Sequence, residues 1–138
     1  MTTTSLVPYL FFNGNCEEAL NFYRTALDGT ITSIQRYSDS PMPVEEEYKN
    51  KVLHSEFHFF ECSFMAADSM PDNEVVNGTS VSLSINMNHL DHAQSIFNKL
   101  SDDGQVTMPF QETFWGAQFG MLTDKFGINW MVSFDENP

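Results

Sequence analysis

The two halves of this chain share one pattern. A strand-like run over residues 7–13 precedes a helical run over 16–27, and the second half opens in the same way, with residues 81–86 before 90–100. The apolar helical positions match at a constant spacing of 74 residues, which pairs Ala19, Phe22, Tyr23 and Ala26 with Ala93, Ile96, Phe97 and Leu100. A duplicated module of this length predicts two copies that face a shared cleft, so the side chains lining that cleft would decide the function.

The repeat predicts an α+β fold in which the order β-α-β-β-β occurs twice. After the helices we expect strands over residues 30–37, 51–61, 63–68, 105–110, 115–123 and 128–134. The length of 138 residues suits a single domain, 1–138, made of a first module, 1–70, and a second module, 79–138. A polar linker over residues 71–78 would join the two modules.

The helix ends have recognisable sequence signals. Asn15 and Glu18 have the spacing of a capping box at the start of the first helix. Gly29 follows this helix and suits a left-handed C-terminal residue. In the second half, Asn88 is the expected N-cap.

The formal net charge of −13 excludes two classes of partner. Lys and Arg do not cluster, so we expect binding neither to nucleic acid nor to an anionic membrane. No apolar run reaches the roughly 20 residues of a membrane span, and residues 1–5 lack the basic and apolar parts of a signal peptide. These features predict a cytoplasmic protein in which Cys16 and Cys62, which have no CxxC spacing, are free thiols.

Three polar side chains alternate with apolar ones in the strand expected around residues 53–60. His54, Glu56 and His58 point to one face, because side chains alternate along a strand. Such a set is a candidate for proton transfer, metal binding or polar ligand contacts. Same-face neighbours on one strand lie about 7 Å apart, which is wide for three ligands of one ion. A half-solvated strand face explains the pattern equally well.

Two further stretches are candidates for lining a pocket. Ser82 and Ser84 alternate with apolar residues and would leave room for a ligand, although a solvent face is the commoner cause. Trp115, Phe119 and Met121 would share one side of the strand over residues 115–123, as in an apolar ligand pocket or a core. The sequence contains no GxGxxG, P-loop, GxSxG or HExxH motif, which excludes the chemistries that those motifs support.

The chain resembles a known family along almost its whole length. The segments 7–23, 81–85 and 107–132 are similar to the PhnB-like branch of the vicinal oxygen chelate superfamily, and Phe114-Trp-Gly with residues 124–127 is the most specific part. This superfamily includes glyoxalase I, bleomycin-resistance proteins and extradiol dioxygenases. The resemblance implies paired βαβββ modules whose curved mixed sheets surround a cleft, usually within a homodimer. The modules could pair within one chain or across the dimer.

The resemblance also implies a place for a metal. Catalytic members hold a divalent ion with His and Glu near the start of each first strand and within each last strand. These places fall at Pro8, Ser82, Met65 and Met131, none of which is a usual ligand for Zn, Ni, Mn or Fe(II). We therefore expect no metal and no other cofactor. The branch is also linked by name to ubiquinone methylation, but the sequence has neither a glycine-rich adenosylmethionine loop nor a doubly wound βαβ pattern.

The leading hypothesis is a metal-free cytoplasmic protein that binds a small molecule in the cleft between the modules. Its apolar walls would come from Met65, Trp115, Phe119 and Met131, and its polar contacts from His54, Glu56, His58 and Ser82. The alternative is a glyoxalase-like lyase, isomerase or dioxygenase. It would use a relocated divalent metal or an acid–base pair such as His54 and Glu56.

Overall fold

The computed structural model describes residues 4–135. The chain divides into two compact units, the first ending at Val75 and the second beginning at Val76, so the boundary lies inside the expected linker. Residues 1–3, which contribute to the expected absence of a signal peptide, lie outside the described residues. In the described part of the chain, neither helix has the length and apolar character needed to cross a membrane.

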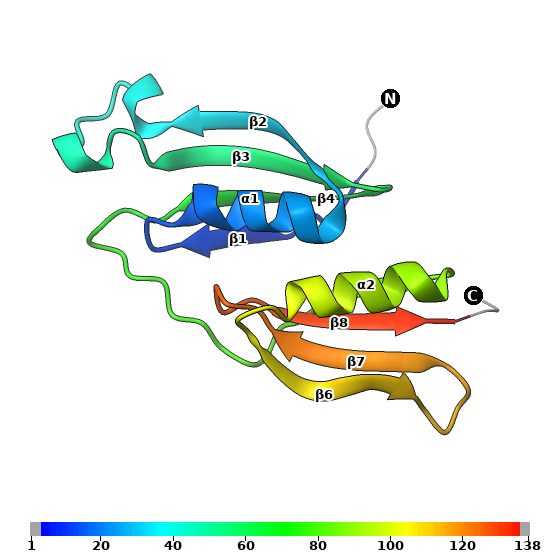
Figure 1. Ribbon diagram of the computed structural model, residues 1–138. Helices are drawn as coiled ribbons and strands as arrows, with labels where there is room; N and C mark the ends of the chain where they lie inside the picture. The colour runs from blue at the N-terminus through cyan, green and yellow to red at the C-terminus, as the bar shows by residue number, and fades with distance from the viewer. Residues whose placement is uncertain (1–3, 136–138) are drawn as a thin grey trace. The chain divides into compact units, whose positions relative to one another are not determined.

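The first unit is a four-stranded mixed sheet with one helix (Figure 1). The strand order is β1-β4-β3-β2, in which β1 and β4 are parallel and the other pairs antiparallel. Two short 3-10 turns interrupt the loop between β2 and β3, at Tyr37–Asp39 and Glu46–Tyr48. The elements are β1 (Tyr9–Phe12), α1 (Cys16–Leu27), β2 (Thr30–Arg36), β3 (Val52–Phe59) and β4 (Cys62–Asp68).

The second unit repeats this arrangement, which confirms the predicted βαβββ duplication. Its strand order is β5-β8-β7-β6, with β5 and β8 parallel and the remaining pairs antiparallel. The elements are β5 (Leu83–Met87), α2 (Leu90–Leu100), β6 (Gln105–Glu112), β7 (Gln118–Thr123) and β8 (Asn129–Phe134).

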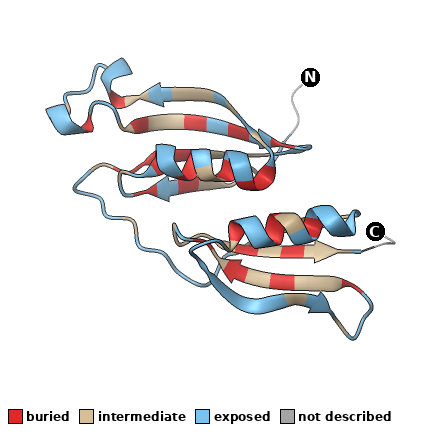
Figure 2. Ribbon diagram, in the orientation of Figure 1, coloured by how far each residue is buried: buried red, intermediate tan, exposed pale blue. Residues whose placement is uncertain are grey.

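Each helix covers one face of its own sheet with the predicted apolar stripe (Figure 2). In the first unit, Tyr23 of α1 meets Phe64 of β4 edge to face, and Phe64 stacks on Phe57 of β3 at 4.9 Å between ring centroids. These three rings are almost completely buried, and burial of one such side chain stabilises a fold by roughly 1.5–3 kcal/mol. Phe22 is only half-buried, unlike the other apolar helical positions matched by the repeat. The buried apolar residues that form the stripes of the two helices are Ala19, Leu20, Tyr23, Ala26, Leu27, Ala93, Ile96, Phe97 and Leu100.

The expected capping box at the start of α1 is wrong. Among the described residues, the Asn15 side chain accepts no capping hydrogen bond from the helix. Instead the carboxylate of Asp68, at the end of β4, accepts the Cys16 backbone N–H at 2.9 Å through Oδ1 and the Val52 N–H at 2.9 Å through Oδ2. A buried aspartate from a distant strand therefore takes the place of the local cap.

Two residues that flank the helices also differ from the prediction, each by one position. Asp28, not Gly29, takes the left-handed conformation after α1, with φ 54°. Gly29 is required for another reason: an added Cβ would lie 2.5 Å from the Phe57 ring. At the start of α2 the cap is His89 rather than Asn88, since its Nδ1 accepts the His92 N–H at 3.3 Å.

The strand expected over residues 115–123 is too long. It begins at Gln118, and Trp115 lies in the turn between β6 and β7. The turn is closed by the Thr113 N–H donating to the Ala117 carbonyl at 2.7 Å, and Gly116 supplies the φ of 93° that the turn needs. The other predicted strands are present, with ends that move by at most two residues.

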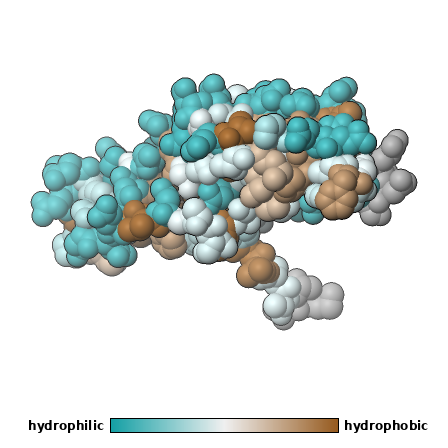
Figure 3. Space-filling view, turned by 90° about the horizontal axis from the view of Figure 1, so that it is seen from below, coloured by the Kyte–Doolittle hydropathy of each residue, from teal (hydrophilic) through white to brown (hydrophobic). Residues whose placement is uncertain are grey.

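The surface reflects the acidic composition, with 19 acidic against 6 basic side chains. On the face shown in Figure 3 most side chains are hydrophilic, and the hydrophobic ones form separate patches among them. The exposed large apolar side chains include Phe11, Met108, Phe114 and Trp115.

Candidate functional site

The first unit has a sheet face that its helix does not cover, here called the first open face. Strand pairing sets its rows: Tyr9 of β1 lies opposite Met65 of β4, and Met65 lies opposite Glu56 of β3. Phe11 extends this face along β1, since side chains alternate along a strand. We define the first open face by Tyr9, Phe11, His54, Glu56, His58 and Met65.

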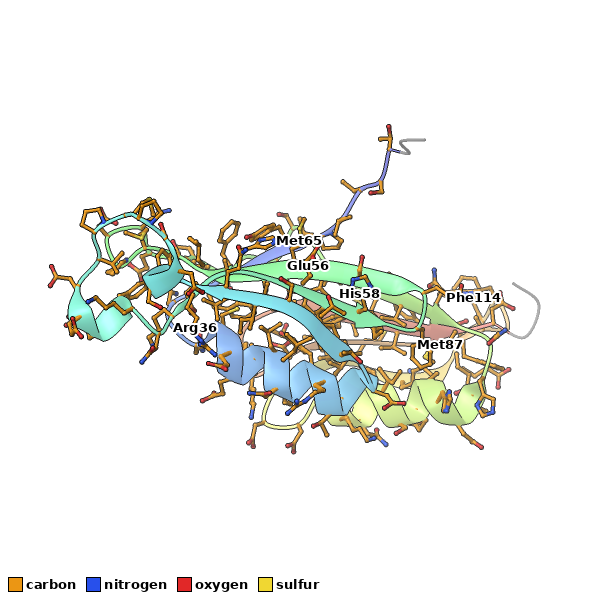
Figure 4. All side chains as sticks on the ribbon, turned by 90° about the horizontal axis from the view of Figure 1, so that it is seen from above. Arg36, Glu56, His58, Met65, Met87 and Phe114 are labelled. Carbon is orange, nitrogen blue, oxygen red and sulfur yellow. The ribbon has the colours of Figure 1, made fainter. Side chains whose placement is uncertain are left out.

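The predicted alternation of β3 is confirmed. Ser55, Phe57 and Phe59 are buried, whereas Glu56 and His58 are exposed. Figure 4 shows Glu56, His58 and Met65 on the side of the sheet away from α1. The structure thus places the polar set on the first open face and not in the core.

His54 has a specific partner on this face. The Tyr9 hydroxyl lies 2.9 Å from His54 Nδ1, and the two rings are 5.7 Å apart. Tyr9 also stacks on Phe11, at 4.8 Å between centroids. Burial raises the pKa of the Tyr9 phenol above its usual value, so this hydroxyl stays protonated at neutral pH and can serve as a hydrogen-bond donor. Sequence reasoning missed Tyr9, although its position two residues before Phe11 follows the same alternation.

The second unit has an equivalent uncovered face, the second open face. Met131 of β8 lies opposite Ser84 of β5 and Met121 of β7, and Met121 lies opposite Met108 of β6. A second row joins Asn86, Ser133, Phe119 and Gln111. We define the second open face by Ser84, Asn86, Met108, Phe119, Met121, Met131 and Ser133.

Two predicted pocket residues lie just outside the strands. Pro8 precedes β1, where its carbonyl accepts the Met65 N–H at 2.9 Å. Strand alternation gives the open-face positions to Tyr9 and Phe11, one residue away from Pro8. Ser82 precedes β5 and is half-buried. It lies two residues before Ser84, so continued strand alternation would direct it to the same face.

Phe119 and Trp115, two other predicted pocket residues, lie close together although the strand is shorter than predicted. Phe119 lies on the second open face, because its neighbours Gly120 and Leu122 are buried on the opposite side. Trp115 reaches it from the turn, with ring centroids 6.4 Å apart, and the adjacent Phe114 ring meets Trp115 edge to face at 4.9 Å. Aromatic side chains therefore border the second open face at this end.

The rows that contain Met65 and Met131 do not fit a divalent metal of the kind that the family resemblance implies. The row of Tyr9, Met65 and Glu56 offers a phenol, a thioether and one carboxylate, and the row of Met131 and its neighbours offers thioethers and a hydroxyl. Zinc and its neighbours in the series prefer imidazole and carboxylate in such sites. Within residues 4–135, no three His, Cys, Asp or Glu side chains come together to hold an ion, which includes the set on β3.

A second missed residue is structural. Asp68 is 2% exposed and borders a depression of about 520 Å³ at the start of α1, which also contains Glu17, Glu18, Glu47 and Lys51. Its two carboxylate oxygens accept the backbone N–H groups described above, and its carbonyl accepts the Tyr37 hydroxyl at 2.7 Å. This carboxylate holds α1, β3 and β4 together, and only the tertiary structure shows it.

Asp124 has a comparable structural role in the second unit. It is buried in the turn between β7 and β8, where Oδ1 accepts the Phe126 and Ile128 N–H groups and Oδ2 accepts the Trp130 indole N–H at 2.8 Å. The turn over residues 124–127 is thus fixed by its first side chain. The indole of Trp130 is buried in the sheet and does not contribute to an open face.

Comparison with known proteins finds one matching family and several similar structures. Residues 4–133 match the family described as 3-demethylubiquinone-9 3-methyltransferase. A crystal structure of protein PA1353 from Pseudomonas aeruginosa is 38% identical, with a TM-score of 0.87 over 96% of this chain and 98% of that chain. A PhnB protein from Bacillus cereus is 30% identical, with a TM-score of 0.81 over 96% and 100% of the two chains.

A more distant structure shows the wider fold. The glyoxylase/bleomycin resistance protein/dioxygenase domain from Frankia sp. EAN1pec is 11% identical and has a TM-score of 0.69, over 97% of this chain and 98% of that chain. At this identity the likeness concerns the fold alone. The family match over residues 4–133 and the 30% identical PhnB protein show that the chain belongs to the PhnB-like family, and its repeated mixed sheets have the fold of the glyoxylase/bleomycin resistance protein/dioxygenase domain.

Proposed function

We propose that this protein binds a small organic molecule on its open sheet faces, without the divalent metal of catalytic relatives. One feature supports this most directly: the last-strand positions that the family resemblance gives to metal ligands are occupied here by Met65 and Met131. A thioether contributes apolar, adaptable contact area rather than a ligand for zinc-like ions. The same positions would then contact the ligand itself.

The rest of the two faces suits this role. Ligand sites combine apolar walls with a few polar groups that fix orientation. The first open face supplies the Tyr9 hydroxyl and the imidazole of His54, 2.9 Å apart, beside the ring of Phe11. The second open face supplies Phe119 and the thioethers.

Methyl transfer, which the family description names, is not part of the proposal. Both sheets are mixed, with a single parallel pair each. They differ from the doubly wound parallel sheets in which nucleotide cofactors bind at a switch point. The proposal does include a homodimer and a cytoplasmic location. The unpaired thiols of Cys16 and Cys62 support the latter, because free cysteines are usual in a reducing compartment.

The test combines metal analysis with methionine methyl spectroscopy. Protein purified without chelator should contain no stoichiometric divalent metal, and one tightly bound ion per chain would contradict the proposal. Protein with isotope-labelled methionine methyl groups should show ligand-induced shifts at Met65 and Met131. The methyl groups of Met42 and Met70, which lie off the open faces, are the internal control; a compound library that shifts only these two would also contradict it. Sedimentation at several concentrations tests the dimer.

A further inference from the structure

The second open face has no charged side chain in the described parts of β5, β7 and β8. Its positions are occupied by hydroxyl, amide, thioether and aromatic groups, whereas the chain as a whole has a net charge of −13. A charged ligand that contacts these strands would lose part of its hydration without gaining an opposite charge from them, which is costly. The face therefore favours an uncharged molecule.

Three methionines form one continuous row across this face. Met108, Met121 and Met131 come from the adjacent strands β6, β7 and β8, each lying opposite the next. Strands are about 4.8 Å apart, so the row is ~10 Å long, comparable with a fused two-ring aromatic system. Thioether sulfur makes favourable contacts with aromatic rings and adapts to their shape. The row thus favours an aromatic ligand over an aliphatic one of equal size.

Aromatic side chains border the row on one side. Phe119 lies in the neighbouring row of the sheet, and the Trp115 ring is 6.4 Å from it at an angle of 53°. Trp115 is 61% exposed, so part of its ring surface remains available for stacking. A planar ligand on the methionine row would meet these two rings at its edge.

A hydrogen-bond donor lies in the same row as Phe119, two strands away on β5. Oδ1 of Asn86 accepts the Ser133 hydroxyl at 2.7 Å and the Ser84 hydroxyl at 3.3 Å. These two bonds use the acceptor of the Asn86 amide and leave its NH₂ group to donate. A ligand that reaches Asn86 would need an acceptor such as a carbonyl oxygen.

From these observations we infer that the second open face binds an uncharged, planar aromatic molecule that carries a carbonyl-type acceptor. The inference rests on the proposed function and names the ligand class for it. The ring system lies on the methionine row beside Trp115 and Phe119, and the acceptor receives a hydrogen bond from the Asn86 amide.

A matched series of naphthalene probes tests the inference. The series comprises 2-acetylnaphthalene, 2-ethylnaphthalene without the acceptor, anionic 2-naphthoate and cationic 2-naphthylmethylammonium, with cyclohexyl methyl ketone as the aliphatic control. Titrations at about 0.15 M salt, where the Debye length is about 8 Å, limit the influence of the remote negative charges. Shifts of the methyl signals of Met108, Met121 and Met131 give both the affinity and the location. We expect the acetyl compound to bind at least about tenfold more tightly than either charged probe.

Three variants assign the interactions. Met121→Leu keeps the apolar volume but removes the sulfur, so affinity for 2-acetylnaphthalene should fall roughly two- to tenfold while that for the cyclohexyl ketone stays unchanged. Asn86→Ala should abolish the preference for the acetyl over the ethyl compound. Met42→Leu, which lies in the other unit and off both open faces, should change neither affinity.

The outcomes separate the two claims. If a charged probe or the cyclohexyl ketone binds the methionine row as tightly as the acetyl compound, the inferred ligand class is wrong. If the probes shift only Met65 on the first open face, the class inference fails while the proposed function stands. If a broad compound library, this series included, shifts no methionine on either face, the proposed function itself fails.

Discussion

The replacement Asp68→Asn tests the account of how the first unit is held together. Asp68 is 2% exposed, and each of its carboxylate oxygens accepts a backbone N–H at 2.9 Å, one from Cys16 and one from Val52. Asparagine keeps a single acceptor oxygen and turns an NH₂ group toward the other N–H. One buried donor then has no acceptor, and two donors face each other.

The size of the effect follows from these contacts. A hydrogen bond to a charged group contributes about 1.5–3 kcal/mol, and an orphaned buried donor costs about 1–3 kcal/mol, terms that overlap in part. We therefore expect Asp68→Asn to lower the free energy of unfolding by about 3 kcal/mol. For a unit of this size that corresponds to a fall in Tm of about 10 °C or more. Local opening at the start of α1 should increase by about 100-fold, because 1.4 kcal/mol is a factor of ten.

Urea denaturation followed by far-UV circular dichroism measures the loss, since both tryptophans, Trp115 and Trp130, lie in the second unit and do not report on the first. Amide hydrogen exchange at Cys16 and Val52 measures the local opening. The matched control is Asp102→Asn, an exposed aspartate with the same change in charge, which should alter stability by less than about 0.5 kcal/mol. A loss below about 1 kcal/mol for Asp68→Asn, or one equal to the control, would refute the reasoning.

Three further predictions concern the same scaffold. Gly29→Ala should destabilise the protein by about 2–4 kcal/mol in urea, because the new Cβ would lie 2.5 Å from a buried ring and 2.8 Å from a carbonyl oxygen; Gly78→Ala, with open space around it, should be nearly neutral. Ellman's reagent should modify Cys62 rapidly in the native protein and Cys16 only on unfolding, since Cys16 is buried and burial raises the pKa of its thiol; two fast thiols would contradict this. Burial, with a smaller effect of a nearby carboxylate, raises the pKa of Tyr48 from 10.0 to about 12, so its contribution to stability is present below pH 10 and is lost as pH rises through about 12. Between pH 10 and 12 the free energy of unfolding of Tyr48→Phe should therefore fall less than that of the wild type. If the two free energies fall with pH at the same rate, the Tyr48 phenol does not titrate as expected.

Local sequence signals predicted the scaffold well. The helical runs at Cys16–Leu27 and Leu90–Leu100 have the predicted bounds, because an apolar stripe with period 3.6 is a property of the segment itself. The prediction of the cap at the start of α1 was wrong because the cap is not a property of the local segment. Asp68 lies 52 residues from Cys16 in the sequence, and no local pattern indicates that a distant strand will supply the acceptor.

The candidate site was predicted in part. Alternation within β3 correctly separated His54, Glu56 and His58 from the buried residues, because strand period is also local. Alignment across strands is not local. Pro8, which the family resemblance placed at the site, lies one residue before Tyr9, and a shift of one residue reverses the face. The contact between Tyr9 and His54 joins two distant strands, so no local pattern indicates it. Trp115 was assigned to a strand because the closing bond between Thr113 and Ala117 has no sequence signature.

The repeat combines one architecture with two different chemistries. Row by row, Tyr9, Met65 and Glu56 of the first unit correspond to Ser84, Met131 and Met121 of the second. Duplication preserves the methionine in the last strand of each unit, while the flanking positions are titratable in one copy and uncharged in the other. The first open face therefore has titratable side chains beside its methionine, and the second has uncharged, polarisable ones.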